Sequence, residues 1–140
     1  MNAEAFLDSN VLIYLLSSGD KAARVEELAN AGGAISVQVL NEITNVCRKK
    51  LKMPWPEVEA FLRDVRELYP RAHSLTLESQ ELGVALASRH LLQPYDGQIV
   101  ASALLAGCVT LWSEDMHDGL VVQDTHGSRM TIRNPFSSAT

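Results

Sequence analysis

The chain has 140 residues, of which 46% are hydrophobic and 21% charged, and its formal net charge is −5. This composition predicts one globular domain over residues 1–140. No stretch approaches the roughly 18 consecutive apolar residues of a membrane span, because Ser17, Asp20 and Lys21 interrupt the longest early run. That run also lacks the basic leader of a signal peptide, and the two cysteines lack CxxC spacing, so we expect a cytoplasmic protein with buried, reduced thiols. Taken alone, the acidic balance argues against a nucleic-acid partner.

The first half of the chain alternates short strands with helices. Apolar residues at helical spacing mark the helices, and Gly32-Gly33 and Pro70 end two of them. The expected elements, in order, are a strand over Ala5–Leu7, helices at NVLIYLL and GDKAARVEELANAGG, a buried strand at AISV, and helices at QVLNEITNVCRKKL and EVEAFLRDVRELY.

The second half continues the alternation. AHSLTL alternates like a strand, and SQELGVALASRHLL returns to helical period. The next helix begins at Pro94 and ends at Gly107, which are the usual positions for these residue types. CVTLW is a strand, SEDMHDG a loop, and LVVQD with MTIRN a late hairpin or edge strand. The pattern predicts an α/β fold with a central, mostly parallel sheet of about five strands and helices on both faces.

Four acidic residues occupy positions where an unpaired charge would be costly if it were buried. They are Asp8 after the first strand, Glu42 beside the apolar stripe of its helix, Asp96 within such a stripe, and Asp115 after CVTLW.

Each acid also has a simpler explanation. Asp8 is a suitable helix cap, and Glu42 is a solvated boundary residue. Asp115 is one of several acids in its loop, where Glu114 and Asp118 compete for any role. Asp96 is the hardest to explain, because a first-turn position offsets only about 0.3–1 kcal/mol of a burial cost of several kcal/mol.

Together the four acids predict a metal site. The carboxyl ends of parallel strands and the starts of the following helices share one edge of a sheet. Carboxylates about 6 Å apart repel by roughly 3 kcal/mol per pair at an effective dielectric of 20, and a divalent cation would relieve that repulsion. Oxygen donors without histidine or cysteine favour Mg²⁺ or Mn²⁺ over Zn²⁺. The expected reaction class is metal-assisted phosphodiester hydrolysis.

Four stretches, in this order and spacing, carry a family resemblance: FLDSNVLIYL, ISVQVLNEI, YDGQIVASAL and LWSEDMHDGL. They resemble the PIN-domain nucleases, and among these the VapC toxins of bacterial toxin–antitoxin pairs. The resemblance covers nearly the whole chain and implies a PIN-like, three-layer α/β/α fold. It also implies a Mg²⁺- or Mn²⁺-dependent endoribonuclease, usually homodimeric, that acts on RNA and is silenced by a small cognate antitoxin, with no membrane partner.

The resemblance also implies roles for individual residues. The family's catalytic and metal-binding acids match Asp8, Glu42, Asp96 and Asp115. Asp118 is implied as an outer or alternative ligand. The supporting polar residues that match the family's motifs are Ser9, Asn10, Ser36 and Ser113.

A basic run, CRKKLK, ends the helix that carries Glu42. Its cations suit a helix C-terminus, but they could equally contact RNA phosphates. These candidate RNA-contacting residues are Arg48, Lys49, Lys50 and Lys52. Trp55, between two prolines, suits either a stacking or partner contact or the core. His117 adjoins the site loop and is a weaker candidate for touching substrate.

Other protein classes share parts of this pattern. A haloacid-dehalogenase-type phosphotransferase needs an aspartate two residues after the first one, where Asn10 stands. A receiver-type signalling domain needs an early acidic pair and a late lysine, which are missing. A catalytically silent PIN-fold binding module, or a different metal-dependent phosphohydrolase on an α/β sheet, stays open, because a fold does not fix a function.

Overall fold

The central sheet of the computed structural model, which describes residues 5–137, has the strand order β1-β4-β6-β5. Three strands run parallel, namely β1 (Ala5–Leu7), β4 (Thr110–Trp112) and β6 (Arg129–Arg133), and β5 (Val121–Gln123) pairs antiparallel with β6. Phe6 lies opposite Leu111, which lies opposite Ile132, so three buried side chains form one row across the sheet. The predicted mostly parallel sheet and late hairpin are confirmed.

The main sheet has four strands rather than the predicted five. β2 (Ile35–Ser36) pairs instead with β3 (Ala72–His73) in a separate parallel pair. An isolated parallel bridge between Ala34 and Phe6 connects that pair to β1. The predicted strand at AHSLTL is wrong beyond His73, because the Thr76 hydroxyl accepts a hydrogen bond from the Ser79 backbone and starts a helix there.

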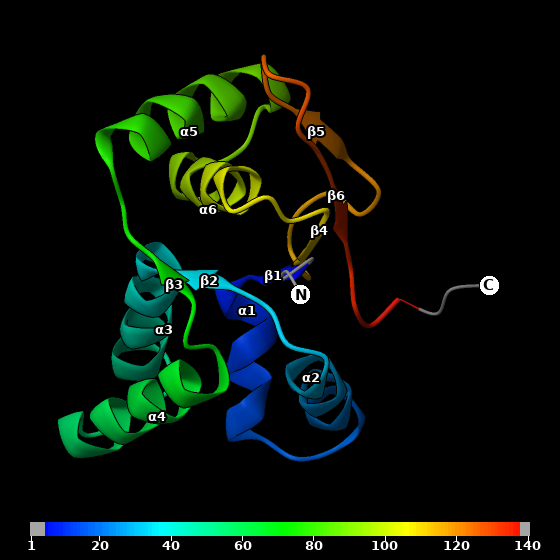
Figure 1. The fold of residues 1–140 in the computed structure, drawn as a ribbon. Helices are drawn as coiled ribbons and strands as arrows, with labels where there is room; N and C mark the ends of the chain where they lie inside the picture. The colour runs from blue at the N-terminus through cyan, green and yellow to red at the C-terminus, as the bar shows by residue number, and fades with distance from the viewer. Residues whose placement is uncertain (1–4, 138–140) are drawn as a thin grey trace.

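The helices form two groups (Figure 1): α5 and α6 lie above β1, β2 and β3, and α1 to α4 lie below these strands. Their bounds are α1 Ser9–Leu12, α2 Asp20–Asn30, α3 Val37–Lys49, α4 Trp55–Leu68, α5 Leu77–His90 and α6 Pro94–Leu105. The helix predicted over residues 10–16 is shorter than expected and continues as a 3₁₀ turn, η1 (Ile13–Leu16). None of the helices within residues 5–137 has the length and apolar character needed to cross a membrane.

The contact between α5 and α6 fixes where α6 begins. A methyl group at Gly97 would lie 2.4 Å from the carbonyl oxygen of Gly83, so only glycine permits this approach of the two backbones. Gly97 follows Asp96 directly, in the first turn of α6. Seven residues of α6 are buried, which makes this helix the inner one of the pair. The tight α5–α6 packing therefore positions Asp96.

We expect Gly97→Ala to lower the free energy of unfolding by about 1–3 kcal/mol, because the added methyl group overpacks a backbone contact. Helix propensity alone predicts the opposite sign, since alanine is favoured over glycine by about 1 kcal/mol within a helix. Urea unfolding measures the difference, with the exposed Ser88→Ala on α5 as the control. A Gly97→Ala chain as stable as the wild type would show that the two helices separate without cost.

Candidate functional site

All four predicted acids line one pocket of about 450 Å³. Asp8 ends β1, Glu42 belongs to α3, Asp96 begins α6, and Asp115 lies in the loop after β4. The pocket is completed by Ser9, Asn10, Ile13, Asn45, Val46, Lys50 and Tyr95. We call this the acidic pocket. It lies at the carboxyl ends of β1 and β4, as expected for an α/β sheet.

Asp8 is the most enclosed of the four, with 2% of its surface exposed. Its Oδ1 accepts a 2.7 Å hydrogen bond from the backbone N–H of Ser9, and so caps the short helix α1. Its Oδ2 accepts a 2.8 Å bond from the Ser113 hydroxyl and a 3.3 Å bond from the Asn10 amide. The helix-cap explanation for Asp8 is therefore correct, and it accounts for only one of its two oxygens.

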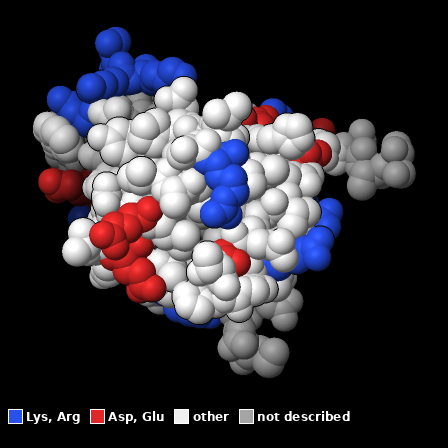
Figure 2. Space-filling model, turned by 90° about the horizontal axis from the view of Figure 1, so that it is seen from above, with Lys and Arg blue, Asp and Glu red and all other residues white. Residues whose placement is uncertain are grey.

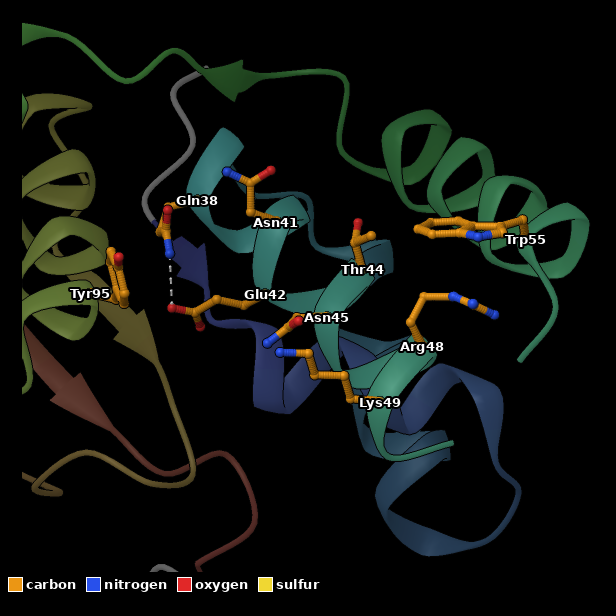
Figure 3. Close-up of a pocket in the computed structure, with 9 residues that line it drawn as sticks. All are labelled: Gln38, Asn41, Glu42, Thr44, Asn45, Arg48, Lys49, Trp55 and Tyr95. Atoms are coloured by element: carbon orange, nitrogen blue, oxygen red, sulfur yellow. Dashed lines mark hydrogen bonds between the residues drawn. The ribbon is translucent and has the colours of Figure 1, made fainter. Parts of the chain in front are cut away.

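Glu42 is held by two polar side chains on the wall of the same pocket. The Ser9 hydroxyl donates a 2.9 Å hydrogen bond to Glu42 Oε1 and also lies 3.3 Å from Asp8 Oδ1. The Gln38 amide, one turn earlier on α3, donates to Glu42 Oε2 at 3.2 Å (Figure 3). Ser9 thus bridges two carboxylates that are 34 positions apart in the chain.

Asn10 ties α1 to the loop that carries Asp115. Its amide nitrogen lies 3.4 Å from the Ser113 oxygen, and its carbonyl accepts a 3.0 Å hydrogen bond from the Glu114 backbone N–H. The Ser113 oxygen also accepts from the Met116 backbone at 3.3 Å. The loop after β4 is therefore fastened to the end of β1, because Asn10 and Ser113 bond both segments.

Burial and neighbouring charge make two of the carboxylates reluctant to ionise. The pKa of Asp8 is raised from its ordinary 3.8 to about 7, chiefly because the carboxyl group is buried. The hydrogen bond from Ser113 lowers this pKa, and the negative charge of Glu42 raises it further. Burial, followed by the charges of Glu42 and Asp115, also raises the pKa of Asp96. The acids are thus electrostatically coupled across the pocket, and a bound positive charge would stabilise their ionised forms.

The donor set suits a hard divalent cation. The acids that line the pocket offer carboxylate oxygens, the ligands that Mg²⁺ and Mn²⁺ prefer. Lys50 also lines the pocket and brings one positive charge to its rim. Within residues 5–137, no three His, Cys, Asp or Glu side chains lie close enough together to hold a metal ion as they stand. The pocket gathers the donors without closing them around an ion.

The other predicted site residues have varied positions. Ser36 is buried and caps α3, where its hydroxyl accepts a 3.3 Å bond from the Val39 N–H. Asp118 is exposed, does not line the acidic pocket, and accepts a 2.8 Å bond from the Asn134 N–H. His117 is exposed and lines a neighbouring hollow together with Asp96 and Asp115.

The basic run is divided between two surfaces. Lys50 lines the acidic pocket, while Arg48 and Lys49 line an adjoining hollow. Lys52 lines neither of them. Trp55 is 52% exposed, which excludes the core alternative for its side chain.

Two contributors were missed from the sequence. Gln38 lies four residues before Glu42, which is the spacing of helix neighbours, and that spacing was the available signal. Tyr95 was seen only as part of the YDGQIV motif, yet it is 67% exposed at the rim of the acidic pocket. Nothing in its immediate sequence distinguishes an exposed tyrosine from a buried one.

Comparisons with known proteins agree with this fold. A family model for the PIN domain matches residues 5–117. A toxin–antitoxin complex from Klebsiella pneumoniae has a similar fold, with a TM-score of 0.63 at 23% identity over 79% of this chain and 86% of that chain. FitAcB from Neisseria gonorrhoeae has a TM-score of 0.63 at 18% identity, over 94% of this chain and 98% of that chain.

A third similar structure is VapC20 from Mycobacterium tuberculosis, described as a Sarcin-Ricin loop cleaving toxin. It has a TM-score of 0.63 at 16% identity, over 79% of this chain and 89% of that chain. At these identities the likeness is one of fold. A comparison with curated protein sequences finds no significant match.

In metal-free buffer we expect Asp8→Asn to melt at a higher temperature than the wild type at pH 8. A raised pKa stabilises the folded state fully below pH 3.8, and this stabilisation is lost as the pH rises through about 7. For the wild type this loss corresponds to roughly 4 kcal/mol of the free energy of unfolding. The amide in Asp8→Asn does not ionise, so the variant does not suffer this loss. The advantage of the variant should shrink at pH 5.

Differential scanning calorimetry at the two pH values measures this effect. The exposed Asp64→Asn on α4 removes an equal charge away from the pocket and is the control. An Asp8→Asn chain that melts below the wild type at both pH values would show that the hydrogen bonds to the carboxylate outweigh its ionisation cost.

Proposed function

The chain belongs to the PIN domain family, and from this premise we propose that it is a Mg²⁺- or Mn²⁺-dependent endoribonuclease that hydrolyses RNA phosphodiester bonds. One observation supports this more than any other. Four carboxylates from four separate segments line a single pocket at the ends of β1 and β4. Carboxylates gathered in this way, with raised pKa values at two of them, are typical of a functional site and costly in a purely structural one.

Asp8, Glu42, Asp96 and Asp115 are the residues that would hold the cation. When bound, a divalent ion supplies an acidified water and neutralises the charge that develops on a phosphodiester. Asp118 is a candidate outer ligand of the cation. Its alternative role is structural, because its side chain accepts a hydrogen bond from the Asn134 backbone.

The polar residues around the acids orient them. Ser9, Asn10 and Ser113 all donate to Asp8, so both of its oxygens have fixed directions. Gln38 and Ser9 fix Glu42 in the same way. Side chains held by such bonds need little rearrangement when they take up their ligand, which favours both binding and charge stabilisation.

We further propose that the protein is the toxin of a toxin–antitoxin pair. Structures with its fold include a toxin–antitoxin complex from Klebsiella pneumoniae, VapBC2 from Rickettsia felis bound to a DNA fragment from its promoter, and the Sarcin-Ricin loop cleaving toxin VapC20. A small antitoxin protein is the partner that this role requires, and a homodimer in the cytoplasm is the expected state.

We expect Asp96→Asn to reduce Mn²⁺-dependent cleavage of RNA by roughly a hundredfold or more, because the site loses both a ligand and a charge. Mn²⁺ should also raise the melting temperature of the wild type by more than that of the variant. Cleavage of a labelled RNA and thermal shift with added Mn²⁺ measure the two effects.

Asp64→Asn, which changes an exposed acid on α4, serves as the matched control and should cleave normally. Cleavage that survives in Asp96→Asn would refute the assigned site. A wild type that binds RNA and Mn²⁺ but cleaves nothing would be a silent binding module.

A further inference from the structure

A second hollow of about 540 Å³, which we call the α3 groove, adjoins the acidic pocket. The two share Glu42, Asn45 and Tyr95 as lining residues, so one continues into the other. Figure 3 shows the exposed side of α3 as its floor, with Tyr95 from the start of α6 on one side and Trp55 from the start of α4 on the other. A ligand in the groove would therefore extend from the acids to Trp55.

The exposed indole of Trp55 is held in place. The guanidinium of Arg48 lies 4.4 Å from the centre of its ring and donates a 2.8 Å hydrogen bond to the Met53 carbonyl. Pro54 and Pro56 restrict the backbone on both sides, since proline fixes φ. A large aromatic side chain that is both exposed and rigid loses little entropy on binding, and so is suited to a planar ligand.

The turn before Trp55 is itself in an unfavourable conformation. Lys52 has a φ of 55°, in the left-handed region that non-glycine residues rarely adopt. A 2.9 Å bond from the Met53 N–H to the Cys47 carbonyl holds this turn against the end of α3. The fold thus maintains a strained turn that returns Trp55 over Arg48.

The chemistry of the α3 groove favours a nucleic acid over a protein. Among the described residues that line it, none has an aliphatic side chain. Its floor offers amide and hydroxyl groups from Asn41, Thr44 and Asn45, which can hydrogen-bond base edges or ribose. Protein-binding grooves have an apolar centre, whereas aromatic rings with interspersed cations are typical of single-stranded nucleic-acid sites.

Charge alone would not hold RNA on this chain. Its formal net charge is −5, and Figure 2 shows acidic and basic side chains in separate small groups on the face that it displays. Stacking of a base on an aromatic ring contributes about 1–3 kcal/mol and does not depend on net charge. Stacking on the exposed rings of Trp55 and Tyr95 would therefore supply binding free energy that a basic surface supplies in other RNA-binding proteins.

We propose that the α3 groove binds single-stranded RNA leading into the acidic pocket, with one unpaired base stacked on Trp55, another on Tyr95, and Lys49 contacting the backbone. This inference rests on the proposed function and specifies the surface and the aromatic side chains that hold its substrate beside the acids. A duplex does not fit, because its bases are already stacked on one another and present no free face.

Fluorescence of Trp55 tests the stacking directly. The chain has two tryptophans, so Trp112→Phe leaves Trp55 as the single reporter. In EDTA, where no cleavage is expected, a 12-nucleotide oligouridine should quench this fluorescence, and a blunt RNA duplex should quench it much less. The proposal would be overturned if the single strand and the duplex quenched the fluorescence equally, or if neither RNA quenched it. Absence of quenching by either RNA would favour a protein ligand for the groove.

Affinity provides the second measurement, by anisotropy of labelled oligouridine in EDTA. Trp55→Ala should raise the Kd about 5- to 150-fold, as expected for one lost stacking contact, and Trp55→Phe should recover part of the loss. Trp112→Phe removes the other, half-buried tryptophan and is the matched control, with the Kd of the wild type. A Trp55→Ala chain with unchanged Kd would refute the inference.

Failure of this inference is distinguishable from failure of the proposed function. The binding measurements contain no metal, while Mn²⁺-dependent cleavage by the wild type tests the acidic pocket separately. If Trp55→Ala binds RNA as the wild type does and the wild type cleaves normally, only the proposed role of the α3 groove is refuted. If the single strand quenches Trp55 but the wild type cleaves nothing, only the proposed nuclease activity is refuted.

Discussion

The enclosure of Asp8 at the end of β1 is the constraint on which the rest of the site depends. A carboxylate that is 2% exposed needs a donor for each oxygen, and the chain supplies these from the next residues and from the loop after β4. Neutral donors satisfy its hydrogen bonds but do not neutralise its charge, so its pKa rises to about 7. The fold therefore fixes the position of Asp8 but provides no positive charge that stabilises its ionised form among the groups that bond it.

The same donors assemble the remainder of the pocket. Asn10 and Ser113 join the ends of two neighbouring parallel strands, which brings the Asp115 loop beside α1. Ser9 connects Asp8 to Glu42 on α3. The contact of Gly83 with Gly97 sets the start of α6, and with it Asp96. Hydrogen bonds from Ser9 and Ser113 therefore link Glu42 and the Asp115 loop to Asp8, while the packing of α5 on α6 places Asp96.

α3 connects the acidic pocket with the α3 groove. One side carries Glu42 into the acidic pocket, and the same helix forms the floor of the groove that leads to Trp55. A cation in the pocket and stacked bases in the groove would divide the binding of RNA between charge and stacking. Under the proposed function, such a division would let a chain with a net charge of −5 bind RNA, because neither contribution requires a basic surface.

The sequence by itself determined the alternation of strands and helices, the parallel character of the sheet and the family resemblance, which the PIN domain match confirms. Hydrophobic period and Pro and Gly punctuation are local signals, and local signals place elements well. These signals were wrong at AHSLTL, where the Thr76 cap starts a helix within an alternating sequence. They were also wrong about the fifth strand, because β2 pairs with β3 in a separate sheet.

Only the tertiary structure decided how the candidate residues divide between surfaces. The convergence of the four acids at one edge of the sheet was predicted from their positions, but the bridging by Ser9 and the exposure of Trp55 were not. Basic residues that are adjacent in the sequence separate in the same way, with Lys50 at the pocket and Arg48 against Trp55. Successive helix residues point in directions about 100° apart, so the surface that each one faces depends on what packs around the helix.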